Sequence, residues 1–391
     1  MPAAVPPGPN YMAEPYYQDK QATLYLGDAL TVLAALPDAC VNCIVTSPPY
    51  WGLRDYGQPG QYGLEDSPLA YVETMRVVFA QARRVLAGDG TLWLNLGDTY
   101  ANRANAAASK SFRADSAAVM PARVNATAIA PRKGLLMVPE RVAMALSDDG
   151  WILRNKIVWH KPNAMPQSVT DRLSGRYEHV FLFAKSPRYH FDLDAIREPA
   201  VTAPGRTWAQ RKAAGEPGRH GLAGQAALGR GGFSAAAAGR NPGDVWAMST
   251  RPYPEAHFAT FPIDLPLRCI TAGTRPGDVV LDPFSGSGTT GAAARILGRR
   301  YLGIELNPTY HDLAITRLAK ACAGPRNETL HELVRNETPG PAGPVRNETR
   351  CQAPRCDNPI PKARTGRPRR FCSPACRARA HRAGAVLTHI R

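Results

Sequence analysis

Two short stretches carry residues whose types and spacing suit chemistry on a ligand with an amino group. The first is Ser47-Pro48-Pro49-Tyr50, which follows the apolar run 41–45. Two consecutive prolines donate no backbone N–H and hold φ at about −65°, so they present rigid carbonyl acceptors at the end of a predicted strand. A hydroxyl and such carbonyls can accept from an exocyclic amine, while the tyrosine stacks on the flat ring that carries it. For this stretch alone, an ordinary tight turn is the simpler interpretation.

The second stretch, at 279–305, has the order strand, glycine loop, helix, strand and acid. Gly286 and Gly288 let the backbone approach a ligand that a Cβ would block, and the N–H groups of the following helix suit a carboxylate. Glu305 ends the second strand, where an acid can bind two ribose hydroxyls. Together with Gly291, the glycines also have the spacing of a dinucleotide site, which leaves NAD as an alternative.

Together, the two stretches resemble the DNA amino-methyltransferases, which methylate cytosine N4 or adenine N6. The catalytic motif of that family is (S/N/D)-P-P-(Y/F), and residues 47–50 match its serine form. Residues 282–290 are similar to the family's S-adenosylmethionine loop, D-P-F-x-G-x-G-T-T. The prefix Asp282-Pro283-Phe284 favours this cofactor over NAD, because an acid near the pocket mouth suits a ligand with an ammonium and a sulfonium.

The resemblance assigns roles to individual residues. Ser47, Pro48, Pro49 and Tyr50 form the implied catalytic turn. Residues 257–262 match the position of a further family motif, which packs on the cofactor. The implied cofactor-binding residues are Asp28, Thr260, Phe261, Pro262, Asp282, Phe284, Ser285, Gly286, Ser287, Gly288, Thr289, Thr290 and Glu305.

The implied reaction takes place on double-stranded DNA at a specific site, and the target base must leave the helix to reach the pocket. Ser47 and the Pro48 carbonyl would accept the two N–H groups of its amine, while Tyr50, with Trp51 as a further candidate, would stack on the ring. In the family, the serine form most often accompanies cytosine N4. We therefore expect methylation at cytosine N4, with adenine N6 as the alternative. Methylation at cytosine carbon 5 would need a Pro-Cys nucleophile, and the sequence contains none.

Two other functions fit parts of the sequence. A catalytically silent DNA-binding protein would use the basic tracts, but the intact motifs at 47–50 and 282–290 argue against it. An enzyme of the same fold that acts on RNA or on a protein glutamine is the other alternative, and the N-P-P-Y form would be expected there.

The order of the motifs bears on the fold class. The catalytic turn precedes the cofactor loop, which is the circularly permuted order of the family's β group. The resemblance thus implies an α/β, Rossmann-like S-adenosylmethionine-dependent methyltransferase sheet over 22–322. Irregular tracts at 101–133 and 200–243 interrupt it, the latter as a candidate target-recognition region. A Pro-rich N-terminus, 1–21, is expected to be disordered, and a flexible linker is expected at 323–350.

Apolar periodicity predicts alternating helices and strands. One helix is expected at 71–86, ended by a turn at Gly88 and Gly90, with a strand at 91–96 after it. The other expected strands are 24–26, 41–46, 151–159, 177–184, 279–281 and 301–304, and the other helices are 29–36, 138–146, 265–271, 289–297 and 309–322.

The basic tail at 351–391 predicts a small structural zinc module. Cys351, Cys356, Cys372 and Cys376 form two pairs with zinc-like spacing in a segment too short for its own core. The segment resembles a zinc ribbon or treble clef of the F-C-S-x-x-C kind. Free thiols, or a histidine in place of one cysteine, are the alternatives. The arginines around the site could contact phosphates or form a protein-binding surface. The C-x-x-C at 40–43 has no second pair nearby and predicts a buried thiol instead.

Composition points to a polyanionic partner. The chain of 391 residues has a net charge of +16 and a pI near 9.7, which favours nucleic acid through counterion release. It has no long apolar run and no N-terminal targeting pattern, so we expect a cytoplasmic protein without a membrane partner. A second copy of the chain and a cognate restriction nuclease are further candidate partners.

Overall fold

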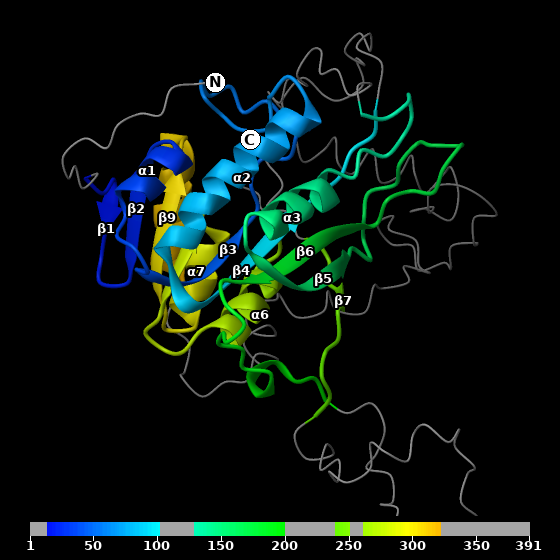
Figure 1. Ribbon diagram of the computed structural model, residues 1–391. Helices are drawn as coiled ribbons and strands as arrows, with labels where there is room; N and C mark the ends of the chain where they lie inside the picture. The colour runs from blue at the N-terminus through cyan, green and yellow to red at the C-terminus, as the bar shows by residue number, and fades with distance from the viewer. Residues whose placement is uncertain (1–13, 102–128, 200–238, 251–260, 322–391) are drawn as a thin grey trace, which may run out of the picture. The chain divides into compact units, whose positions relative to one another are not determined.

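A mixed β-sheet is the centre of the computed structural model, which describes residues 14–101, 129–199, 239–250 and 261–321. Within these residues the sheet has nine strands in the order β1-β2-β9-β8-β3-β4-β6-β5-β7 (Figure 1). The strands are β1 (Tyr17–Gln18), β2 (Ala22–Leu26), β3 (Val41–Thr46), β4 (Leu86–Leu96), β5 (Ile152–His160), β6 (Tyr177–Ala184), β7 (Val245–Ala247), β8 (Val279–Asp282) and β9 (Arg300–Glu305).

The direction of the strands creates a switch point between β8 and β3. Strands β2, β9, β8, β3 and β4 are parallel, whereas β6 is antiparallel to both of its neighbours, β4 and β5. The chain continues from β3 to β4 on one side of the sheet and from β8 to β9 on the other. In open α/β sheets, ligands bind at the carboxyl ends of the strands where the order reverses in this way. The predicted α/β class is confirmed.

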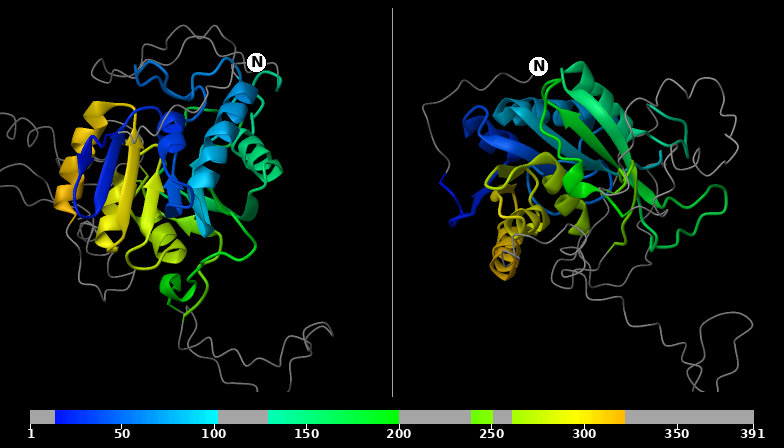
Figure 2. Two further views of the ribbon diagram at one scale, coloured as in Figure 1. Left: turned by 60° about the vertical axis from the view of Figure 1, so that its left-hand side comes forward. Right: turned by 90° about the horizontal axis from the view of Figure 1, so that it is seen from below.

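Helices cover both faces of the sheet. On one face α1, α2 and α3 pack side by side, and on the other α6, α7 and α8 do so, as the view from below shows (Figure 2). Because both faces are covered, β3 can be apolar on both sides, as its run of buried residues indicates. The helices are α1 (Ala29–Ala35), α2 (Pro68–Val85), α3 (Val138–Asp148), α6 (Asp264–Gly273), α7 (Thr289–Ile296) and α8 (Pro308–Lys320), with a short 3-10 helix η2 (Asp194–Ile196).

Helix α2 carries the largest share of the core on its face. Its start is fixed by Ser67, whose side chain accepts from the Ala70 N–H at 3.1 Å, and by a proline at the first helical position. Tyr71, Met75 and Phe79 follow at helical spacing and are fully buried against the sheet. The predicted amphipathic helix is confirmed, with an earlier start than its apolar spacing showed.

A β-bulge replaces the glycine turn that was expected at Gly88 and Gly90. The chain passes from α2 directly into β4, and the stretch from Leu86 to Thr91 is opposed by only the stretch Val41–Cys43 of β3. A Cβ on Gly90 would lie 2.8 Å from the Asn42 carbonyl oxygen. The glycine therefore permits a close approach of two backbones, and both glycines belong to β4, so the prediction of a turn before the strand was wrong.

The N-terminus is ordered earlier than expected. The prediction of disorder over 1–21 is wrong for its last part, because β1 pairs with β2. Asp19 explains the order: its carboxylate accepts from the N–H groups of Gln21 and Ala22, both at 2.8 Å, and forms an ion pair with Arg295 of α7.

The remaining predicted helices and strands are present in the described residues, with ends that differ by one or two positions. Cys43 is fully buried in β3, which confirms the buried thiol. Most of the tracts 101–133 and 200–243 lies outside the described residues, and so do the linker and the zinc module. None of the helices in the described ranges has the length and apolar character needed to cross a membrane.

Candidate active site

A pocket at the carboxyl ends of β3, β8 and β9 brings the two sequence motifs together. Ser47 comes directly after β3, and the glycine loop comes directly after β8, the neighbouring strand. Both line the same pocket, as the motif analysis predicts. Its lining residues that were predicted from the sequence are Asp28, Ser47, Pro49, Phe261, Asp282, Phe284, Ser285, Gly286, Ser287, Thr289 and Glu305.

Asp282 joins the two motifs, which lie far apart in the sequence. Its Oδ1 accepts from Thr46 Oγ1 at 2.6 Å and from the Phe284 N–H at 3.1 Å, and its Oδ2 accepts from Thr290 Oγ1 at 2.7 Å. Thr46 is the residue before Ser47, so this one carboxylate fixes the catalytic turn to the cofactor loop. It is 2% exposed and lies at the base of the pocket, which corrects the expectation of a position near the mouth. Burial raises the pKa of Asp282 to about 6, although the bonds from both threonines lower it.

Glu305 holds the other side of the glycine loop. Its Oε2 accepts from the Gly286 N–H at 2.8 Å and its Oε1 from the Asn307 N–H at 2.9 Å. Burial raises the pKa of Glu305, and the two backbone donors act against that rise. Because an ionised carboxylate has about four acceptor positions, two such bonds leave capacity for ligand hydroxyls.

Several predicted cofactor residues shape the pocket without lining it. Thr290 binds Asp282 and the Val45 carbonyl, the latter at 3.3 Å. Gly288 is the N-cap of α7 at φ +77°, and a Cβ there would lie 2.8 Å from the Cβ of Ala314 in α8. Pro262 is buried near the start of α6. Thr260 and the four predicted metal ligands, Cys351, Cys356, Cys372 and Cys376, lie outside the described residues.

Comparison with known proteins identifies the family. A family profile described as DNA methylase matches residues 41–316. The chain belongs to this family of N6/N4 DNA methylases. Type II methyltransferase M.Cfr9I of Citrobacter freundii is 46% identical over 299 residues, which cover 76% of this chain and 87% of that protein. Type II methyltransferase M.SmaI of Serratia marcescens is 38% identical over 301 residues, or 77% of this chain and 92% of that protein.

The fold of this methylase is that of a solved relative. PvuII DNA methyltransferase (cytosine-N4-specific) superimposes with a TM-score of 0.54 at 19% sequence identity, and the match covers 83% of this chain and 94% of that one. With the family match, the chain is a type II, S-adenosylmethionine-dependent DNA amino-methyltransferase, an enzyme of restriction-modification whose substrate is DNA.

The pocket of this methylase suits S-adenosylmethionine. The ligand needs hydrogen-bond acceptors for its ammonium group and its ribose hydroxyls. It also needs negatively charged groups near the sulfonium and a flat apolar slot for adenine. Asp282 and Glu305 supply carboxylates at the two sides of the glycine loop. Phe284 and Tyr62 supply aromatic faces, with their rings edge to face at 5.5 Å.

Part of this aromatic wall was not found from the sequence. Tyr56, Tyr62 and Tyr310 all line the pocket, and Tyr56 meets Tyr310 edge to face at 6.5 Å. Tyr62 donates to the carboxylate of Asp28, which also accepts from the Thr31 N–H at 2.9 Å and thereby caps α1. Tyr56 and Tyr62 lie in the loop that follows the catalytic turn. The available signal was the pair of tyrosines within it.

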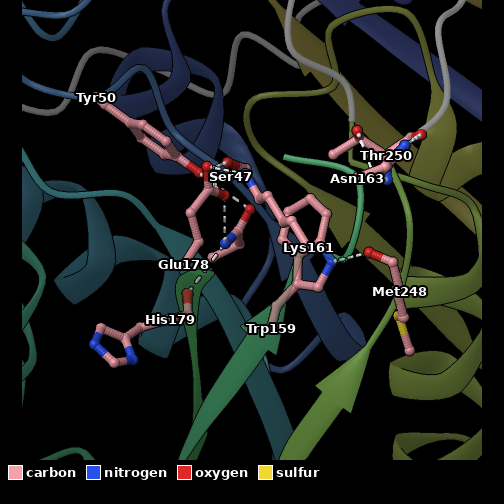
Figure 3. A network of polar contacts seen from close by, with 10 residues as sticks. Ser47, Tyr50, Trp159, Lys161, Asn163, Glu178, His179, Met248 and Thr250 are labelled. Carbon is pink, nitrogen blue, oxygen red and sulfur yellow. Dashed lines mark hydrogen bonds and ion pairs between the residues drawn. The ribbon is translucent and has the colours of Figure 1, made fainter. Parts of the chain in front are cut away.

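A polar network surrounds Tyr50, which does not line the cofactor pocket (Figure 3). Ser47 Oγ donates to Tyr50 Oη at 3.3 Å, and Tyr50 Oη lies 2.9 Å from Glu178 Oε2 and 3.1 Å from Asn95 Oδ1. Glu178 also forms an ion pair with Lys161. Glu178, Asn95 and Lys161 were not predicted. The available signal is that Asn95 and Glu178 are polar residues next to apolar runs in β4 and β6.

Trp51 does not face a flipped base, so that candidate was wrong. It is 3% exposed, packs in the core beneath α2, and donates its indole N–H to the Glu65 carbonyl at 2.9 Å. The Tyr50 ring is held against Gly97, where a Cβ would come within 2.5 Å of Cε2.

Proposed function

We propose that this methylase is site-specific and methylates the exocyclic N4 of a cytosine flipped out of double-stranded DNA. The observation that carries the proposal is that Ser47 lines the same pocket as Phe284 and Asp282. A serine offers a neutral acceptor, where an aspartate would offer a charged one. In the family, the neutral form most often accompanies cytosine N4. Adenine N6 is the second candidate.

The catalytic turn would orient the amine and expose its lone pair. The amine of a nucleobase is a poor nucleophile because its lone pair is delocalised into the ring. Ser47 Oγ and the Pro48 carbonyl would accept its two N–H groups and favour sp³ geometry at nitrogen. The Pro49 carbonyl is occupied, because Tyr71 Oη donates to it at 2.9 Å. When bound beside the turn, S-adenosylmethionine supplies the electrophilic methyl group.

Digestion of the methylated DNA tests the base assignment. The enzyme should be incubated with S-adenosylmethionine carrying a labelled methyl group and with DNA of mixed sequence, followed by hydrolysis to nucleosides and mass spectrometry. We expect the label in N4-methyl-2′-deoxycytidine. Label in N6-methyl-2′-deoxyadenosine would replace the cytosine proposal with the adenine one, and label in RNA offered in parallel would contradict both.

We also propose the domain assignment made from the sequence, with a catalytic domain at 22–322, recognition of the target by 200–243 and a structural zinc module at 351–391. The support for zinc is the spacing of the four cysteines.

Metal analysis tests the zinc proposal. The double variant Cys351→Ser, Cys372→Ser should lose the zinc found in the purified wild-type chain, yet keep its methyl-transfer rate at saturating DNA, because the catalytic pocket lies in another part of the chain. Cys40→Ser, which changes a partly buried thiol of the catalytic domain, is the matched control and should keep the metal. Wild-type protein without zinc would contradict the proposal.

A further inference from the structure

We propose that Glu178 is the terminal proton acceptor of the reaction, reached from the target amine through the hydroxyls of Ser47 and Tyr50. The inference rests on amine methylation by this pocket, but it holds for cytosine and adenine alike. It gives a role to a carboxylate that neither sequence motif contains. Glu178 acts through two other side chains and is therefore a positioning and proton-accepting group, not one that touches the base.

The three groups form a continuous chain of hydrogen bonds. Ser47 Oγ lies 3.3 Å from Tyr50 Oη, and Tyr50 Oη lies 2.9 Å from Glu178 Oε2 (Figure 3). The figure shows Glu178 reaching from β6 between Tyr50 and Lys161. Ser47 also lines the cofactor pocket, whereas Tyr50 and Glu178 are not among its lining residues. This chain of hydrogen bonds thus begins at the pocket, where the amine would bind, and ends at a residue outside the pocket lining.

The direction of donation follows from counting protons. A phenol has one proton, and Tyr50 can give it to Glu178 Oε2 or to Asn95 Oδ1, which is 3.1 Å away. The charged and nearer oxygen is the stronger acceptor. Burial and the charge of Glu178 hold the pKa of the Tyr50 hydroxyl well above its usual value. The phenol therefore keeps its proton until it receives another from Ser47.

This direction determines what Ser47 presents to the pocket. Because Tyr50 donates to Glu178, its oxygen accepts the proton of Ser47. The Ser47 oxygen then turns its lone pairs toward the ligand, which is the orientation that an acceptor for an amine requires. Without Glu178, Tyr50 could donate to Ser47 instead, and the serine proton would point at the amine.

Two further contacts keep the carboxylate in place. Lys161 Nζ pairs with Glu178 Oε1, with both side chains less than a fifth exposed. The same ammonium lies 4.2 Å from the centre of the Trp159 ring. Asn95 Nδ2 donates to Glu178 Oε2 at 3.3 Å. Glu178 therefore keeps one oxygen for the lysine and turns the other toward the relay.

The proton balance is complete without another reactant. The amine nitrogen forms a bond to the methyl carbon, the bond from sulfur to that carbon breaks, and sulfur keeps the electron pair. The nitrogen must lose one proton to become a neutral secondary amine. That proton passes to Ser47 Oγ, the serine proton passes to Tyr50 Oη, and the phenol proton passes to Glu178, which returns it to solvent before the next turnover.

Three variants of the full-length enzyme test the relay: Glu178→Gln, Tyr50→Phe and the double variant. Single-turnover methyl transfer is measured at saturating DNA and S-adenosylmethionine, with the Kd of the cofactor as the check on folding. Each single variant should lose about 100-fold in rate with little change in Kd, which is the lower range for a general base. The double variant should lose no more than either single one, because both interrupt the same chain.

A control and a rescue exclude a merely structural role. Glu140→Gln is the matched control, because Glu140 also pairs with a lysine, Lys156, and is similarly buried; its rate should not change. Added formate should partly restore the methyl-transfer rate of the Glu178→Ala variant, since a small carboxylate can replace the lost acceptor. A Glu178→Gln rate within about threefold of wild type, or additive losses in the double variant, would overturn the relay. Those results leave the base assignment intact, just as N6-methyl-2′-deoxyadenosine in the digest would leave the relay intact.

Discussion

Replacing Ser47 by alanine should lower the single-turnover methyl-transfer rate by about 10³-fold, the range seen when one stabilising group is removed from a preorganised site. The alanine removes the acceptor at the pocket side of the turn and cuts the chain that leads to Tyr50. The two flanking prolines fix the backbone independently of the side chain, so the turn should keep its shape. The Kd of S-adenosylmethionine should therefore stay within about threefold, because Asp282 and Glu305 are untouched.

Rapid-quench measurement of labelled DNA gives the rate, and calorimetry gives the cofactor affinity. Ser186→Ala is the matched control, because that hydroxyl donates to the Arg188 carbonyl in a loop outside the pocket. It should retain full activity. If Ser47→Ala transferred methyl groups at the wild-type rate, Ser47 would have no part in the mechanism. If it lost cofactor affinity and rate together, the serine would be part of the cofactor site and not of the catalytic turn.

The site was predictable from the sequence where its geometry is local. Each motif directly follows an apolar strand, so the sequence shows that Ser47 and Gly286 lie at strand ends. Their meeting depends on β3 and β8 being neighbours, which the family resemblance supplied and the strand order confirms. The Asp282 bridge between Thr46 and Thr290 could not be found this way, because the sequence does not distinguish an aspartate buried beneath the pocket from one at its mouth.

The Glu178 network could not be predicted from the sequence for another reason. Its members come from two strands and two loops, and the antiparallel register of β4 and β6 decides which side chains meet. Leu96 pairs with His179 in that register, which brings Glu178 beside Gly97 and the Tyr50 ring. A shift of one residue would turn Glu178 to the opposite face of the sheet. The β-bulge after α2 was missed similarly, because glycines in a close backbone approach resemble glycines in a turn.

Changing Asp282 to asparagine should reduce kcat/KM for S-adenosylmethionine by about 100-fold, the effect of losing a charge-assisted interaction of some 3 kcal/mol. The asparagine side chain can still occupy the position of the Asp282 carboxylate. Its oxygen can accept from Thr46 and Phe284, and its Nδ2 can donate to Thr290, whose own proton then goes to the Val45 carbonyl. The variant should therefore fold and lose the negative charge at the base of the pocket. Asp278→Asn, at the other end of β8, should leave cofactor affinity unchanged.

The same variant should change how stability depends on pH. Burial raises the pKa of Asp282 from 3.8 to about 6, so between these values the folded state holds a proton that the unfolded chain has released. The resulting stabilisation is fully present below pH 3.8 and is lost as pH rises through about 6. A shift of this size corresponds to about 3 kcal/mol of unfolding free energy. Asparagine does not titrate, so denaturant unfolding of Asp282→Asn between pH 4 and 7 should lack this decline. A variant with the wild-type pH slope would show that Asp282 is not the buried acid that links the two motifs.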